Sequence, residues 1–243
     1  MSKHLLSPDD HDRHTKRRKK TTTHDNKDQQ PSLLEQLPYE LLTTIFIHSS
    51  NAQLPLVNRT FYYALYHCPE DVKLQWLLHR DKYVMGLALE RGLRYRFFNQ
   101  RLLDRFDAMH GTPIRLDNKM LPPHLFAECD PQRHDLVVKL LERGASPHKP
   151  QGYPLIKSAQ IGNLAMIKSL VAFGADPTAK DNMALRVCAA RDNKELVNYF
   201  LSDLGVKPDS ETLKACVRKD LWDMVNLLIA HGAVPDLSTI NCT

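Results

Sequence analysis

The chain has 243 residues, a formal net charge of +5 and 42% hydrophobic residues, which suits one or two domains with a buried core. No apolar run approaches the roughly 18 residues of a membrane-spanning helix, and we expect neither a membrane segment nor a secretory signal. The five cysteines are scattered without a CxxC pair, which is typical of a reducing compartment and indicates the nucleus or the cytoplasm.

The positive charge is unevenly distributed along the chain. Residues 1–30 hold eight Lys and Arg against five Asp, and residues 71–120 hold ten basic against six acidic residues. Residues 121–243 are balanced at fourteen against fourteen. The excess therefore belongs to two segments, and it gives little support to nucleic-acid binding by the whole protein.

Residues 1–30 contain almost no apolar residues after Leu5 and Leu6, so they cannot offset the entropy of ordering, and we expect a disordered basic tail. A five-residue basic run interrupts this tail. Such a run is typical of a nuclear import signal or a nucleic-acid patch, and it is also compatible with a plain solvated tail. The run consists of Lys16, Arg17, Arg18, Lys19 and Lys20.

The next region, residues 31–70, begins with "LPYELLTTIF" at residues 37–46. Its apolar residues recur with spacings of four and five, which predicts a helix with one apolar side, and Pro38 suits the first helical turn. A second apolar stretch follows at residues 54–67. A region of this size has too few apolar positions to fold unaided, so it must lean on the rest of the chain or on a partner.

This region resembles an F-box, the small three-helix motif that docks on the Skp-type adaptor subunit of cullin-type ubiquitin ligases. The matching positions are Leu37, Pro38, Glu40, Leu41, Leu42, Ile45, Phe46, Leu54, Val57, Arg59 and Phe61. The gap between Phe46 and Val57 is shorter than usual for the family. The resemblance implies contact with the ligase adaptor through Leu37, Pro38, Leu41, Ile45 and Leu54. We expect Ile45 and Phe46 also to hold the motif together. The alternative is an ordinary amphipathic helix that caps the following helices.

Residues 71–120 are interpreted as a degenerate helical connector. "LALERGLRY" at residues 87–95 is similar to "KLLERGASP" at residues 139–147. A helix is predicted over residues 94–106, with Phe97, Phe98, Leu102, Leu103 and Phe106 on its apolar stripe. Arginines near these aromatic residues could indicate a nucleic-acid platform, although a helix with a charged outer face explains them more simply. Residues 110–123 are predicted to form a loop.

Residues 121–243 carry a repeated phrase. The phrase ends in Gly144, Gly174, Gly205 and Gly232, at steps of 30, 31 and 27 residues, and each Gly is followed three residues later by Pro. Apolar residues recur at fixed offsets before each Gly. The third unit fits this register only with one residue inserted near Leu204. Each Gly is predicted to end a helix in the left-handed conformation, and Pro prevents the helix from resuming.

This pattern resembles about four degenerate ankyrin repeats, each made of two short helices and a loop. Asp192 and Asp220 stand where the family has Gly between the helices, and Cys129, Ala159, Ala189 and Val217 stand at small packing positions. The resemblance implies an all-α solenoid whose first helices and finger loops bind a protein client. The positive residues expected on that face indicate an acidic client surface, although they are equally compatible with ordinary solvated positions. The expected client-binding residues are Lys149, Tyr153, Lys157, Lys180, Arg186, Arg191, Lys214, Arg218 and Lys219.

The sequence contains no phosphate-binding GxxxxGK[ST], no HExxH, no GxSxG and no dinucleotide motif. We therefore expect no catalytic site, cofactor or metal. The leading hypothesis is a monomeric substrate-recognition adaptor in a cullin-type ubiquitin ligase, with an unidentified protein client. The second is a nuclear ankyrin scaffold without a ubiquitin role. The third is an RNA or DNA binder that uses the tail and the arginines of residues 91–105.

Overall fold

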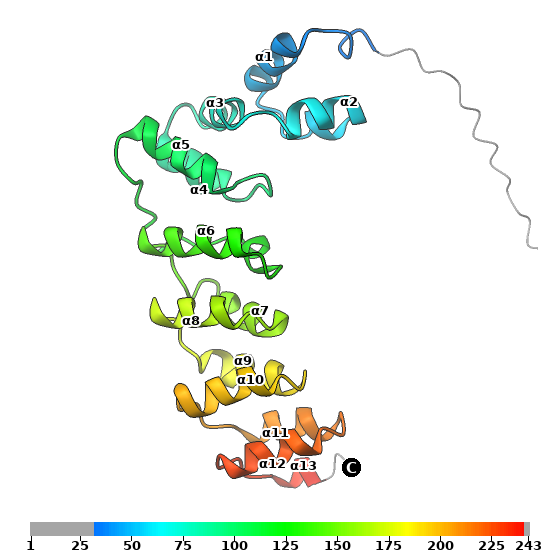
Figure 1. Cartoon of the computed structure of the whole chain (residues 1–243), viewed down its shortest axis with the longest axis vertical. Coiled ribbons are helices and arrows are strands. Elements are labelled where there is room, and N and C mark those ends of the chain that lie inside the picture. The colour runs from blue at the N-terminus through cyan, green and yellow to red at the C-terminus, as the bar shows by residue number, and fades with distance from the viewer. Residues whose placement is uncertain (1–31, 241–243) are drawn as a thin grey trace, which may run out of the picture. The chain divides into compact units, whose positions relative to one another are not determined.

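The computed structural model describes residues 32–240 and confirms the all-α prediction (Figure 1). Within these residues the only β-type pairing is an isolated bridge between Met120 and Ser146. The chain divides into two compact units, Met1–Gln36 and Leu37–Thr243. The predictions of disorder for residues 1–30 and of an import signal at residues 16–20 lie outside the described residues. All the helices found in residues 32–240 belong to the second unit.

The first elements of this unit are α1 (Tyr39–Ser49), η1 (Leu54–Leu56), α2 (Arg59–Phe61) and the π-helical η2 (Tyr62–Tyr66). Pro38 begins α1, since its carbonyl accepts hydrogen bonds from the N–H groups of Leu41 and Leu42. Leu42 and Phe46, one helical turn apart, are buried, and Phe46 stacks on Trp76 of α3 (Glu70–Arg80) at 5.1 Å between ring centroids. The small motif therefore packs on the helix that follows it.

The middle of the unit contains α4 (Met85–Gly92) and α5 (Gln100–His110) in addition to α3. The helix predicted over residues 94–106 is wrong at its start, because Asn99 caps α5 by accepting a hydrogen bond from the N–H of Leu102 at 2.8 Å. Residues 94–98 form turns instead. The predicted apolar stripe of Leu102, Leu103 and Phe106 is buried, and residues 111–122 form the expected loop.

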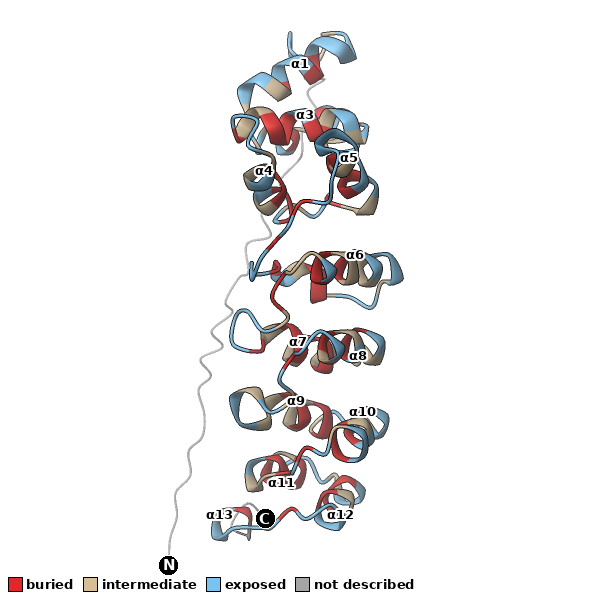
Figure 2. Cartoon of the chain, turned by 90° about the vertical axis from the view of Figure 1, so that its left-hand side faces the viewer, coloured by how far each residue is buried: buried red, intermediate tan, exposed pale blue. Residues whose placement is uncertain are grey.

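The remaining helices come in consecutive pairs. They are η3 (Pro123–Phe126) with α6 (Pro131–Glu142), α7 (Tyr153–Ile161) with α8 (Leu164–Ala172), α9 (Ala179–Ala189) with α10 (Lys194–Asn198) and η4 (Tyr199–Asp203), and α11 (Ser210–Val217) with α12 (Trp222–Ala230), followed by α13 (Leu237–Ile240). First helices contact first helices along the series α7, α9, α11 and α13, while α6 contacts α8. The buried residues lie where these helices meet (Figure 2).

The four repeated glycines all have positive φ, as predicted: 87° at Gly144, 91° at Gly174, 64° at Gly205 and 91° at Gly232. Asp192 and Asp220 adopt the same left-handed region, at 55° and 56°. Both aspartates thus take the conformation that Gly162, at 89°, takes at the matching turn of its own pair. The turn between the two helices of each of these pairs therefore keeps its left-handed conformation with aspartate in place of glycine.

The extra residue predicted near Leu204 is absorbed by the π-helical η4. In the other three units, the N–H that follows the capping glycine donates to a carbonyl five residues earlier: Ala145 to Leu140, Ala175 to Leu170, and Ala233 to Leu228. In the third unit, Val206 donates to Phe200, six residues earlier. The wider turn accommodates one residue while Phe200 stays buried.

One predicted packing position is wrong. Ala159, Ala189 and Val217 are buried, whereas Cys129 is exposed. The difference arises because the first element of its unit is the short 3-10 turn η3 and not a full helix. Cys129 therefore falls in the bend that precedes α6, beyond the reach of the neighbouring pair.

Candidate protein-binding surfaces

The first candidate surface lies on α1. Of the residues predicted to contact a ligase adaptor, Pro38, Leu41 and Ile45 are exposed, with Leu41 at 50% and Ile45 at 39% of their full accessible area. Leu37 and Leu54 are half-buried against the core. The expectation that Ile45 helps hold the motif together is wrong, because Leu42 and Phe46 face α3 and leave Ile45 toward solvent.

The elements after α1 also expose large apolar side chains. Leu56 and Val57, at the end of η1, and Tyr63 of η2 are more than half exposed, and η2 packs beside α1. Apolar exposure concentrated in one short segment is typical of a binding surface. We call the exposed apolar and aromatic side chains between positions 37 and 63 the N-terminal apolar surface. They are Pro38, Tyr39, Leu41, Ile45, Leu56, Val57 and Tyr63.

The second candidate surface comprises the first helices and loops of the later pairs. Arg191 and Arg218 are exposed and make no ion pair with any residue in 32–240. Lys180 likewise has no ion pair among the described residues, whereas the remaining predicted cations have partners within the chain. Lys157 donates to the side chain of Gln160, Arg186 pairs with Asp209 at 3.3 Å, Lys219 donates to the carbonyl of Ala190, and Lys149 donates to the carbonyl of Asn118.

Lys214 is not an exposed cation, which corrects the prediction for this residue. It is only 8% exposed, and its ammonium lies 2.6 Å from the Glu211 carboxylate and 3.3 Å from that of Asp236. The hydrogen bond to Glu211, followed by that to Asp236, raises the pKa of Lys214. The residue is covered because α13 packs on α11, an arrangement that the repeat pattern did not predict.

Of the predicted loop residues of this second surface, Lys180 is exposed, while Tyr153 is half-buried at the start of α7. Lys180 and its neighbours Asp181 and Asn182 all have φ between 54° and 56°. Arg186 donates to the carbonyl of Asp181, so the turn at residues 180–182 is held against its own helix. The structure thus brings Lys180, Arg191 and Arg218 to the surface as accessible positive charges.

Two adjoining cavities lie elsewhere, and the sequence did not predict them. The smaller, of about 280 Å³, is lined by residues of the small motif, α3 and the turn at residues 94–97. The larger, of about 730 Å³, lies between that turn, α5 and α6. Tyr66, Arg96 and Phe97 line both cavities.

Among residues 32–240, no group of His, Cys, Asp and Glu is arranged to hold a metal ion. In the same range, no helix combines the length and the apolar character that a membrane crossing needs.

Comparison with known proteins gives one match. A family model described as the YDR249C N-terminal domain matches residues 35–66, the segment that carries the N-terminal apolar surface. This is a similarity over a small part of the chain. No curated protein and no solved structure matches the chain significantly.

Proposed function

We propose that the chain is a non-enzymatic adaptor that holds two proteins at once. In this proposal the N-terminal apolar surface docks the Skp-type adaptor of a cullin-type ubiquitin ligase, and the paired helices bind a client. The observation that carries it is the exposure of Leu41 and Ile45 on a helix whose Leu42 and Phe46 are buried. A helix that needs only its inner side for the core has no structural use for a second apolar side.

The later helices support the client-binding half. Four glycine-capped pairs in one register, with first helices packed on first helices, are consistent with ankyrin-like repeats. Such repeats present a surface and carry no chemistry of their own. Lys180, Arg191 and Arg218 give that surface accessible positive charge, which favours an acidic client.

A second candidate function is a nuclear ankyrin scaffold without a ubiquitin role. The packing of Phe46 on Trp76 favours it, because a helix that covers the end of a helical stack needs that contact and no external partner. In this alternative the basic run at residues 16–20 serves as a nuclear address. The N-terminal apolar surface would then bind no ligase adaptor.

A binding assay separates the two candidates. The full chain is immobilised and titrated with the purified Skp-type adaptor, alongside a Leu41→Asp/Ile45→Asp double variant and a His48→Ala control on the same helix. Leu41 and Ile45 are both exposed, so we expect the double variant to keep the unfolding temperature of the unaltered chain. We expect it to bind the adaptor at least tenfold more weakly. Absence of binding by the unaltered chain, or equal binding by the double variant, excludes the ligase role.

A further inference from the structure

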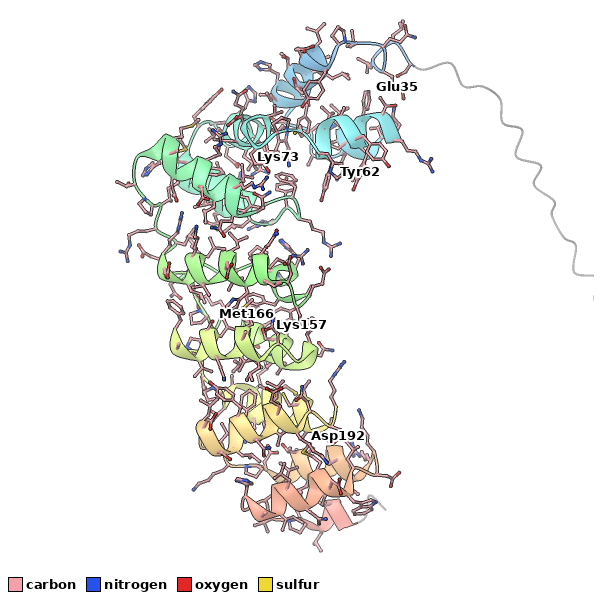
Figure 3. All side chains as sticks on the ribbon, in the orientation of Figure 1. Glu35, Tyr62, Lys73, Lys157, Met166 and Asp192 are labelled. Carbon is pink, nitrogen blue, oxygen red and sulfur yellow. The ribbon has the colours of Figure 1, made fainter. Side chains whose placement is uncertain are left out.

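Helix α3 places two buried polar groups on one side. Lys73 and Trp76 are three residues apart, so their side chains lie on the same face of the helix, and they are only 9% and 1% exposed. The indole N–H of Trp76 is buried and has no hydrogen-bond acceptor among the described residues. Lys73, labelled in Figure 3, makes no ion pair or hydrogen bond with any residue in 32–240.

Such groups are costly inside a protein. A buried donor without an acceptor, such as the indole N–H of Trp76, loses about 1–3 kcal/mol. The ammonium of Lys73 is not among the fully buried unpaired atoms, and it lies 5.8 Å from the centroid of the Phe97 ring. The nearby carboxylate of Glu70 lies beyond ion-pair distance from Lys73, although the two charges attract each other. This carboxylate accepts a hydrogen bond from the side-chain amide of Asn99. The indole N–H of Trp76 therefore lacks the partner that its burial calls for, while the Lys73 ammonium faces the larger cavity without an ion-pair partner among the described residues.

Each of the two groups lines one of the adjoining cavities. Trp76 lines the smaller cavity, whose walls are mainly apolar and include Phe46, Pro55, Leu56 and Leu65. This cavity suits an aliphatic or aromatic side chain. Arg94, which is exposed and unpaired within the described residues, stands on its rim.

Lys73 lines the larger cavity, which has both positive and negative walls. Two of its acidic residues are already engaged: Asp104 pairs with Lys139 at 3.3 Å, and Asp130 caps α6 and pairs with Arg133. The third, Asp135, lies 3.6 Å from the His134 ring, a contact that is an ion pair only when that ring is protonated. Lys73 and Arg101 line the same cavity and form no ion pair with a described residue. These two cations outnumber Asp135, so the unused charge of this cavity is net positive.

We propose that the two cavities form one groove for an acidic, extended segment of a partner protein. One aliphatic or aromatic side chain of that segment fills the smaller cavity. A neighbouring carboxylate enters the larger cavity and accepts a hydrogen bond from Lys73. The chain's own basic run at residues 16–20 has the wrong charge for this groove. The proposal does not depend on the ligase role, because the lining shares only Leu56 with the N-terminal apolar surface and α1 contributes only Phe46.

The probe is a fluorescein-labelled peptide with one central phenylalanine and three glutamates on each side, titrated with the full chain by fluorescence anisotropy. Two matched peptides replace the glutamates with lysines, or the phenylalanine with serine. We expect the acidic phenylalanine peptide to bind at least tenfold more tightly than either control, and its affinity to fall as salt is raised. Equal binding of the three peptides overturns the proposal.

Variants of the chain locate the site. Lys73→Met keeps the buried stem and removes the charge, and we expect about tenfold to hundredfold weaker peptide binding with a cooperative unfolding transition. Arg101→Ala, on an exposed residue, should weaken binding severalfold even if Lys73→Met fails to fold. Arg218→Ala and the Leu41→Asp/Ile45→Asp variant should bind the peptide unchanged, which separates this groove from both surfaces of the adaptor proposal.

Three outcomes contradict the assignment. The first is unchanged peptide affinity in folded Lys73→Met and Arg101→Ala. The second is a dimer in sedimentation experiments that Lys73→Met dissociates, which would assign the groove to a second copy of the chain. The third is tighter peptide binding after Asp9→Ser and Asp10→Ser, which would assign it to acidic residues of the chain itself.

Discussion

Arg143, which follows α6, donates two hydrogen bonds to the carboxylate of Asp107 on α5, at 2.9 and 2.6 Å. The two side chains are only 10% and 25% exposed. Two parallel hydrogen bonds from a planar guanidinium to a carboxylate fix the geometry of the pair, and such charge-assisted bonds are stronger than hydrogen bonds between neutral groups. This contact joins the segment predicted as a connector, residues 71–120, to the first of the repeated units.

Replacement of Arg143 should therefore destabilise the unit. We expect Arg143→Ala to lower the free energy of unfolding by about 1.5–3 kcal/mol, because it leaves Asp107 largely covered and without its donor. Arg143→Lys should lose less stability than Arg143→Ala, because it keeps the positive charge. It should not match the unaltered chain, because an ammonium cannot form the two parallel bonds. Urea unfolding followed by circular dichroism measures both.

The matched control is Arg115→Ala. Arg115 pairs with Asp117 at 2.9 Å, but the two side chains are 77% and 68% exposed, so their pair is worth at most a few tenths of a kcal/mol. Equal effects of Arg143→Ala and Arg115→Ala would show that the Asp107 contact contributes nothing beyond a surface pair.

The wide turn η4 yields a prediction about chain length. Deletion of Ser202, which is exposed, should convert the π-helical turn into an ordinary α-helical one and restore the spacing found in the other units. We expect a cooperative thermal transition within a few degrees of the unaltered chain, since about 1 kcal/mol corresponds to 2–4 °C at this size.

Deletion of Lys168 is the comparison. Lys168 is also exposed, but it lies in the regular α8 between the buried Ile167 and Leu170. Loss of one residue there rotates the following side chains by about a quarter turn about the helix axis and removes Leu170 from the core. The thermal transition should therefore broaden, or its midpoint temperature should fall by more than 10 °C. Similar melting curves for the two deletions would contradict the role assigned to η4.

The sequence predicted the helix pairs well because glycine caps and apolar spacing are local signals. Gly174 and the buried Ile167 and Leu170 lie where the pattern expected them. The sequence was a poorer guide to which residues are exposed, because exposure depends on which other element covers a residue. Lys214 is covered by α13, and Cys129 is uncovered because η3 is short. Lys73 and Trp76 gave no sequence signal of a site, because their burial depends on α1, α4 and α5, which pack on α3.

The left-handed turn at Asp220 provides a stability test. An L-residue with φ of 56° is strained, and aspartate tolerates that region better than most residues. We expect Asp220→Gly to raise the free energy of unfolding by up to about 1 kcal/mol and Asp220→Val to lower it by about 1–2 kcal/mol. Thermal melts of the two variants measure the difference. A valine variant as stable as the glycine variant would mean that the turn relaxes to another conformation.

The cysteines differ in accessibility, and this predicts their reactivity at pH 8. Cys129 is exposed, while Cys68, Cys188 and Cys216 are buried. Iodoacetamide should label Cys129 within minutes in the native protein and reach the buried three only after unfolding, because the reagent needs an accessible thiolate. Mass spectrometry of the digested protein assigns each site. Labelling of Cys188 as fast as that of Cys129 would show that α9 is not packed as described.

The same burial makes stability depend on pH in the alkaline range. Burial raises the pKa of Cys188 from its ordinary value of 9.0 to about 12, and those of Cys68 and Cys216 to about 11. Above pH 9 the unfolded chain releases these protons while the folded chain retains them, so the unfolded state binds fewer protons and the free energy of unfolding falls as pH rises. The loss between pH 9 and pH 10 should be about 1 kcal/mol for each buried cysteine. Cys188→Ala should reduce that loss by about 1 kcal/mol whatever its effect at pH 7, whereas Cys129→Ser should leave it unchanged. Urea unfolding at both pH values measures the losses, and equal losses in the two variants would contradict the burial of the Cys188 thiol.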